Sequence, residues 1–159
     1  MPFDLAFAQS RIKQGNTDIR KKLQLAKIGK PKDLKMLAED PDPHVRCAVA
    51  MRHNNHCLNI LAHDENVYVR RAVALQGRRK DMNVFVHDPD PIVRSLVAKY
   101  GREKDLDVLV HDPDERVRVA VIANGRDKDL KTLLHDDSPL VVRAIADMAY
   151  KKLCQLQAR

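Results

Sequence analysis

The sequence predicts an all-α protein, a right-handed α-solenoid whose 24-residue repeats each hold one helix and one shorter helix. The first indication is a Val-Arg pair that recurs at Arg46, Arg70, Arg94 and Arg118, because a fixed period in this range is typical of solenoids. The second is the length of the repeat, which is too short for two full-length helices, so neither helix buries its apolar face without stacking. The third is a chain without Trp, whose core must come from Leu, Val, Ile and Ala.

The stretch 1–39 is expected to form an N-terminal cap and a degenerate repeat. Residues 4–13 predict a short amphipathic helix, and residues 1–15 as a whole are expected to cap the solenoid with a polar outer face. In the degenerate repeat, residues 16–39, the pair Ile19-Arg20 takes the place of Val-Arg.

Each regular unit, over residues 40–138, begins with a residue that favours a helix cap. The expected caps of the first helices are Asp42, Asn66, Asp90, Asp114 and Ser138, and proline follows at residues 43, 91 and 139. The helix then buries the valine of the Val-Arg pair and residues three and four positions on. Left-handed glycines are expected to end these helices at Gly77, Gly101 and Gly125. Caps of the second helices are expected at Asp81, Asp105 and Asp129.

Residues 139–159 predict one longer helix that caps the C-terminal end. Its residues available for burial are Leu140, Ile145, Met148, Leu153 and Leu156. The Val-Arg pair recurs there at Arg143, one residue out of register. With this helix, residues 1–159 are expected to be a single solenoid domain.

The repeated pattern resembles the leucine-rich variant repeat. It reads Asp-Pro-Asp-x-x-Val-Arg-x-x-Val-Ala with a leucine pair before the next Asp, closely over residues 40–146 and loosely over 16–39. It is also similar to the broader HEAT-like α-solenoids, which share an Asp followed six residues later by an Arg. The resemblance implies α-helices alternating with short helices, 3₁₀ among them, wound into a superhelix. Certain leucine-rich variant proteins carry an iron–sulfur module, but the three cysteines of this chain exclude a four-cysteine cluster.

The arginines of the Val-Arg pairs and the aspartates six residues before them predict a structural ladder. Its members are Asp40 and Arg46, Asp64 and Arg70, Asp88 and Arg94, and Asp112 and Arg118. We expect each guanidinium to bond an aspartate of its own or the neighbouring turn and the loop carbonyls, which ties unit to unit. The competing interpretation is an anion-binding stripe, which regular recurrence beside a core valine disfavours.

Two groups of residues raise the question of a metal site. One histidine precedes each Asp turn, at His63, His87, His111 and His135. Stacked helices lie about 8–10 Å apart, too far for two of these imidazoles to share a zinc ion. An irregular repeat also gathers His44, Cys47, His53, His56 and Cys57, with His53 in the place of the turn glycine and Cys57 in that of the second cap. Their spacing matches no standard zinc pair, so a drifted repeat is preferred, metal binding there stays open, and no metal or cofactor is predicted.

The best candidate binding site is the turn between the two helices of each unit. Its basic residues, named here the basic edge, are Lys30, Lys32, Arg78, Arg79, Lys80, Arg102, Lys104, Arg126 and Lys128. One position of every repeat lies on one edge of a solenoid, so these cations would follow a phosphate backbone or an acidic protein surface. The alternative is a solvated edge whose cations favour the preceding helix C-terminus.

Composition and motifs favour a non-enzymatic binding or scaffold protein. A net charge of +7 permits nucleic acid but does not require it, and the three tyrosines do not recur one per unit as a base-stacking platform would. There is no phosphate-binding glycine loop, His-Glu-x-x-His or nucleophile elbow. We therefore expect interaction with a protein partner. Sequence-independent binding of a nucleic-acid backbone through the basic edge is the alternative.

The setting is expected to be cytoplasmic. The cysteine count is odd, the N-terminus lacks the pattern of a signal peptide, and no apolar stretch approaches the ~20 residues of a membrane span. No membrane partner is therefore predicted, and the oligomeric state is left open.

Overall fold

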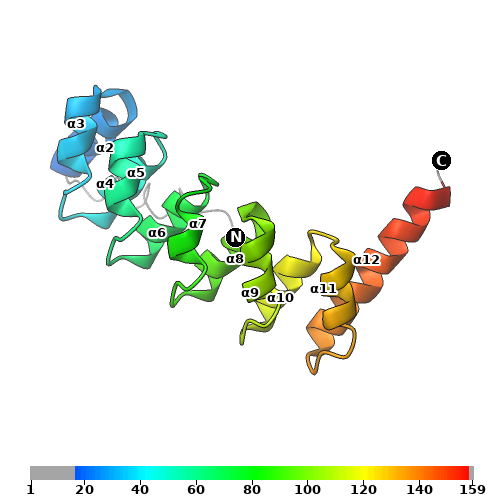
Figure 1. The fold of residues 1–159 in the computed structure, drawn as a ribbon. Helices are drawn as coiled ribbons and strands as arrows, with labels where there is room; N and C mark the ends of the chain where they lie inside the picture. Colours follow the sequence, from blue (N-terminus) through cyan, green and yellow to red (C-terminus); the bar gives the residue numbers. More distant parts are fainter. Residues whose placement is uncertain (1–16, 158–159) are drawn as a thin grey trace. The chain divides into compact units, whose positions relative to one another are not determined.

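The computed structural model describes residues 17–157, and every regular element in this range is an α-helix (Figure 1). The predicted all-α fold class is therefore confirmed, with no 3₁₀ segment in the described range. The expected N-terminal cap, residues 1–15, lies outside the described residues. The chain divides into two compact units, residues 1–76 and 77–159. The expectation of a single domain stays a prediction.

The first unit holds two kinds of helix that alternate along the chain. In order they are α2 (Thr17–Ile28), α3 (Pro31–Leu37), α4 (Pro43–Ala50), α5 (Asn55–Leu61) and α6 (Val67–Ala74). The first helices of successive repeats, α2, α4 and α6, pack against one another in sequence order. The second helices, α3 and α5, pack against the first helices that flank them. This neighbour-to-neighbour packing is that of a solenoid.

The second unit repeats the same arrangement. Its helices are α7 (Met82–Phe85), α8 (Pro91–Tyr100), α9 (Glu103–Leu109), α10 (Glu115–Ile122), α11 (Asp127–Thr132) and α12 (Pro139–Gln157). Here α8, α10 and α12 are the first helices, and α10 packs between the other two. The second helices α7, α9 and α11 are short, at four to seven residues, and each packs against a first helix.

A fully buried valine marks the register of the repeat in the first helices. The valines are Val45 and Val69 in the first unit and Val93, Val117 and Val141 in the second. Val141 keeps the period of the buried valine, whereas the last Val-Arg pair, at residues 142 and 143, lies one residue out of register, as the sequence indicates. Val142 stands where the next ladder arginine would be, and Arg143 lies exposed outside that register.

The first repeat also departs from its prediction. Lys22 lies one full repeat before Arg46, and its Nζ lies 3.0 Å from Oδ2 of Asp40. It therefore takes the place that we expected Ile19-Arg20 to take. The physical reason is that the cation of the ladder must lie close enough to bond the aspartate of the next turn, as Lys22 does. The prediction instead looked for a residue pair similar to Val-Arg.

The predicted caps of the first helices are confirmed. Side-chain oxygens of Asp42, Asn66 and Asp114 each accept a hydrogen bond of 2.9 Å from the backbone N–H two residues on. Asp90 accepts from the N–H of Val93 at 3.0 Å, and Ser138 Oγ accepts from residue 140 at 3.2 Å. Each bond satisfies an N–H that the helix leaves without a partner.

The turns after the first helices follow two geometries. Gly77 and Gly125 are left-handed as predicted, with φ of 65° and 68°, and His53 takes the same conformation with φ of 53°. Gly101 is extended, with φ of −72° and ψ of 176°, so that prediction is wrong. The reason is that α8 continues to Tyr100, and the chain leaves the helix directly at the glycine.

The predicted caps of the second helices are wrong for Asp105 and Asp129. These aspartates lie at the third position of α9 and α11, and the cap residues are Arg102 and Arg126. Asp81 does precede α7, but its carboxylate makes no cap hydrogen bond. In all three repeats the carboxylate of this aspartate instead bonds the arginine three residues earlier.

The predicted C-terminal helix forms as one element of 19 residues, α12. Of the side chains expected to be buried, Ile145 and Met148 are half-buried, whereas Leu140, Leu153 and Leu156 are exposed. The physical reason is the face on which each side chain lies: Val141, Ile145 and Met148 recur at spacings of three and four residues on the side that packs on α10, whereas the three leucines lie on other sides of α12.

Candidate binding surface

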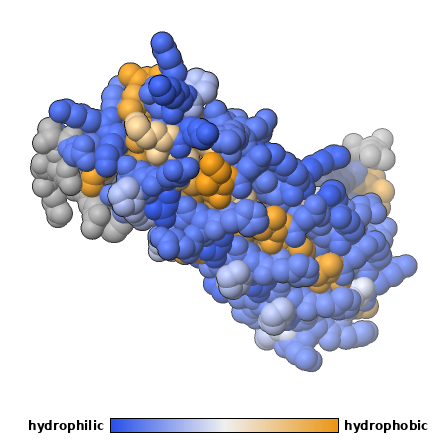
Figure 2. Space-filling view, turned by 60° about the vertical axis from the view of Figure 1, so that its left-hand side comes forward, coloured by the Kyte–Doolittle hydropathy of each residue, from blue (hydrophilic) through white to orange (hydrophobic). Residues whose placement is uncertain are grey.

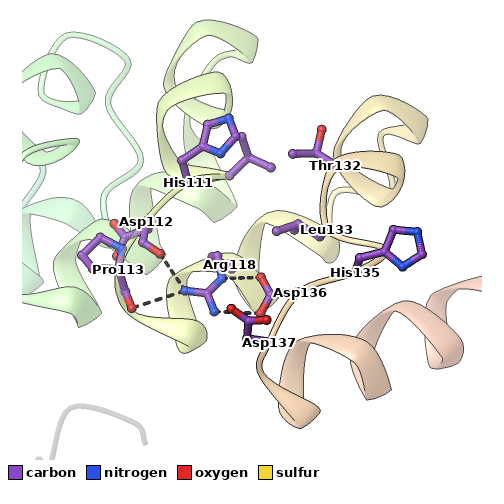
Figure 3. Close-up of a pocket in the computed structure, with 10 residues that line it drawn as sticks. His111, Asp112, Pro113, Arg118, Thr132, Leu133, His135, Asp136 and Asp137 are labelled. Atoms are coloured by element: carbon purple, nitrogen blue, oxygen red, sulfur yellow. Dashed lines mark hydrogen bonds and ion pairs between the residues drawn. The ribbon is translucent and has the colours of Figure 1, made fainter.

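The ladder arginines of the second unit join consecutive repeats. Arg118 donates from Nε and Nη2 to the two carboxylate oxygens of Asp136, at 2.7 and 2.8 Å. Its Nη1 donates to the carbonyl oxygens of Asp112 and Pro113, at 2.7 and 3.3 Å, so the guanidinium lies between two turns (Figure 3). Arg94 makes the same four bonds with residues 88, 89 and 112. Such bidentate pairing holds the two turns in a fixed geometry.

The first unit contains the same device. Arg46 pairs with Asp64 at 2.7 and 2.9 Å and bonds the carbonyl oxygens of residues 40 and 41. Arg70 donates to the carbonyl oxygen of Asp64 at 3.0 Å, and Asp40 receives Lys22. The structure thus brings the ladder residues together as the contacts between repeats, and their cations face carboxylates and carbonyls of the chain itself.

The electrostatics of a ladder pair favour its charged form. The hydrogen bonds from Arg118 lower the pKa of Asp136 below its ordinary value, although partial burial opposes the shift. The bonds from Asp136 correspondingly raise the pKa of Arg118. Both groups therefore remain ionised at neutral pH.

Three arginines of the basic edge turn back onto their own repeats. Arg78, Arg102 and Arg126 each form an ion pair with the aspartate three residues later, at 2.7, 3.0 and 2.6 Å from Nε to Oδ2. These aspartates are buried. Burial by itself would raise the pKa of Asp105, but the hydrogen bonds from Arg102 outweigh burial and lower it. These arginines therefore stabilise the start of the second helices.

The remaining members of the basic edge are exposed. They are Lys30, Lys32, Arg79, Lys80, Lys104 and Lys128. Lys128 forms an ion pair of 2.7 Å with Asp107, and Asp107 also receives Arg126 at 3.0 Å. The backbone N–H of Lys30 donates to Asp33 at 2.8 Å. The exposed cations of this edge are thus its lysines and Arg79.

An exposed apolar side chain recurs on the second helices, a feature that the sequence interpretation missed. We name the residues Met36, Ile60, Val84 and Val108 the apolar column; they occupy one position of successive repeats and are 38–63% exposed. Met36 and Ile60 belong to the first unit, and Val84 and Val108 to the second. Figure 2 shows separate hydrophobic patches on a mostly hydrophilic surface. Isolated exposed apolar residues are common, but recurrence at one position of the repeat sets this column apart.

Lysines flank the apolar column one helical turn away. Lys32 precedes Met36 in α3, and Lys104 precedes Val108 in α9, each by four residues. Residues four apart lie on one face of a helix. Each unit therefore presents an apolar group beside a cation on its second helices. The signal in the sequence was the recurrence of Met, Ile, Val and Val at the period of the repeat, outside the core positions.

A shallow groove of about 450 Å³ lies beside the ladder pair of the second unit (Figure 3). It is lined in part by His111, Thr132, His135 and Asp137. An equivalent groove of about 500 Å³ in the first unit includes His63. The imidazoles of His111 and His135, both at the groove, lie apart from each other (Figure 3). Since the guanidinium at the bottom is engaged by the chain, the groove offers little to an anion.

The irregular repeat keeps its cysteines in the core. Cys47 and Cys57 are buried, and burial raises the pKa of the Cys47 thiol to about 12. His44 bonds its own cap residue, Asp42, through Nδ1 at 2.8 Å, while His53 and His56 are exposed. Over residues 17–157, no three His, Cys, Asp or Glu side chains come together in a way that would hold a metal ion.

None of the helices in the described range has both the length and the apolar character needed to span a bilayer. Comparison with models of protein families, with curated proteins and with solved structures finds no match to this chain. Within each compact unit, the surface with the most consistent chemistry is the exposed face of the second helices, which carries residues of the apolar column and an adjacent lysine.

Proposed function

We propose that this chain is a non-enzymatic binding protein of the leucine-rich variant type, which works in the cytoplasm and docks a protein segment on its second helices. The observation that carries the proposal is the apolar column, one exposed apolar side chain at the same position of four repeats. Within each compact unit two of these groups recur one repeat apart, an arrangement that suits an extended partner segment. The exposed lysines beside the column favour a segment that alternates apolar and acidic residues.

Most arginines of the repeats are engaged within the chain and contribute to its structure. Ladder arginines bond the next turn, and Arg78, Arg102 and Arg126 bond buried aspartates. This leaves apolar contact, with lysines at the rim, as the main source of binding energy on the second helices.

A displayed library of random peptides tests the proposal. Peptides selected on the wild-type chain should be rich in Asp, Glu and large apolar residues. The double variant Val84→Ser, Val108→Ser should weaken their binding by about tenfold or more, since each loss of an apolar contact removes about 1 kcal/mol. Both valines are exposed, so the fold should tolerate the change.

The matched control is Ile92→Ser, an equally exposed apolar residue on the first helix α8. It should leave binding unchanged. Failure to select any peptide, or selected peptides that ignore the double variant or respond equally to the control, would contradict the proposal.

The alternative function, binding of a nucleic-acid backbone, is supported by the exposed members of the basic edge. Fluorescence anisotropy with duplex and single-stranded probes separates it from the leading proposal. Backbone binding should weaken steeply with salt and fall with Lys104→Glu, while Lys151→Glu on α12 should have less effect. Salt-steep binding that persists near physiological ionic strength and depends on Lys104 would favour this alternative.

A further inference from the structure

A second surface, on α12, has the pattern of a helix-packing seam. Its residues are Val142, Ala146, Ala149, Leu153 and Leu156, with spacings of four, three, four and three residues. All five are exposed, with Val142, Leu153 and Leu156 at 46, 53 and 69%. Spacings of three and four are those of the a and d positions at which two helices pack side by side. We name these residues the α12 seam.

The equivalent face of the other first helices of this unit is covered. Ala98 in α8 and Ile122 in α10 are buried, and Ala146 lies one full repeat after Ile122 in the same register. At Gly125, in the turn after α10, a Cβ would lie 3.7 Å from the side chains of Met148 and Lys152, so this end of the repeat lies against the next first helix, α12. The α12 seam is therefore the stacking face of a repeat, exposed where α8 and α10 have theirs covered.

The α12 seam carries an apolar residue at the position where α8 and α10 carry a ladder arginine. Val142 replaces the arginine that α8 and α10 carry at positions 94 and 118. A helix that packs here needs no carboxylate to receive a cation, only an apolar stripe of its own. From Val142 to Leu156 the seam extends about 21 Å along the helix.

We propose that the α12 seam pairs with the α12 seam of a second copy of this chain, with the two helices antiparallel. A two-fold interface requires a patch that is complementary to itself, and the seam meets this condition. In the antiparallel register Val142 packs on Leu153 of the second copy, and Ala146 packs on its Ala149. The two alanines let the backbones approach closely at the centre, while the larger residues fill the ends.

The surroundings of the seam support this orientation. α12 packs on α10 along a face that includes Val141, Met148 and Lys152, which leaves the seam, on another side of the helix, free to pair in the antiparallel orientation. Arg143 then lies near Tyr150 of the second copy, a favourable cation–π neighbour. Antiparallel helix dipoles also attract each other.

The size of the seam predicts a dimer of moderate affinity. Burial of these residues in both copies would remove roughly 800 Å² from water, an area in the range of weak, transient interfaces. The dimer should therefore form and dissociate over an accessible range of protein concentration. The inference is independent of the peptide-binding proposal, because the apolar column does not take part.

Sedimentation equilibrium of the 159-residue chain tests the association directly. The wild type should pass from monomer to dimer as concentration rises. Ala149→Glu should raise the dimer dissociation constant by about tenfold or more, because it buries charges at the centre of the seam. The matched control, Gln155→Glu, adds the same charge at an exposed position outside the seam and should change little. A chain that stays monomeric, or a dimer indifferent to Ala149→Glu, would overturn the proposal.

The orientation is tested with a spin label at Cys154, which is exposed while Cys47 and Cys57 are buried. Antiparallel pairing places Cys154 opposite residue 141 of the second copy, so the two labelled positions lie about 20 Å apart along the axis. Pulsed dipolar spectroscopy should find this longer separation. A separation near the interaxial distance of about 10 Å would show parallel helices and reject the proposed arrangement.

Discussion

Replacement of Arg118 by Met should lower the free energy of unfolding far more than the loss of an exposed arginine would. The guanidinium makes two bonds to Asp136 and two to backbone carbonyls, and its side chain is only 16% exposed. Removal of one partner of a buried ion pair costs about 3–5 kcal/mol, and exposed pairs contribute up to about 1 kcal/mol. For this largely buried pair we expect the free energy of unfolding to fall by about 2–4 kcal/mol.

The control for this substitution is two residues away. Arg116→Met removes the same group, but Arg116 is 61% exposed and pairs with Asp114 at the surface, so stability should remain close to wild type. A double-mutant cycle of Arg118→Met with Asp136→Asn should give a coupling energy of about 1–3 kcal/mol.

Urea unfolding followed by far-UV circular dichroism is the appropriate assay, because the chain is helical and has no Trp. If Arg118→Met costs no more than Arg116→Met, or if the two ladder substitutions add without coupling, the assigned role of the ladder is wrong.

Three further predictions concern acid, backbone strain and thiols. Arg118 lowers the folded-state pKa of Asp136 below 3.8, so the stability that the ionised carboxylate contributes is complete above pH 3.8 and is lost as the pH falls through the lowered pKa. The urea midpoint of the wild type should therefore fall between neutral and acid pH, and the midpoint of Arg118→Met should fall less. His53→Gly should stabilise the chain by about 1 kcal/mol, as the left-handed conformation costs His more than Gly, whereas Gly125→Ala should destabilise it by a similar amount; thermal unfolding measures both. Iodoacetamide should modify one cysteine of the native protein, Cys154, and all three after denaturation, as read by mass spectrometry.

The fold was largely predictable because its signals are local and periodic. The caps at Asp42, Asn66 and Asp114 and the valine register follow from residue type and spacing alone. Gly101 was not predictable in this way, because two extra residues of α8 change the backbone at a position that looks equivalent in the sequence.

The site was less predictable, because exposure depends on neighbours outside the repeat. Arg78 and Arg102 were taken for a free edge, although an aspartate three residues later in each case indicated an ion pair. The exposure of Leu153 and Leu156 depends on which face of α12 packs on α10, and the sequence of α12 alone does not contain this information.

Arg46, Arg94 and Arg118 each donate toward the C-terminus, to a carboxylate 18 residues later, so such a repeat carries one donor and one acceptor. If residues 88–111 were duplicated after His111, Arg94 would meet the copied aspartate, and the copied arginine would meet Asp112. Addition or loss of a whole repeat therefore leaves no ladder charge without a partner, while an insertion of another length breaks a rung. The chain can thus change its length in whole units without new compensating residues.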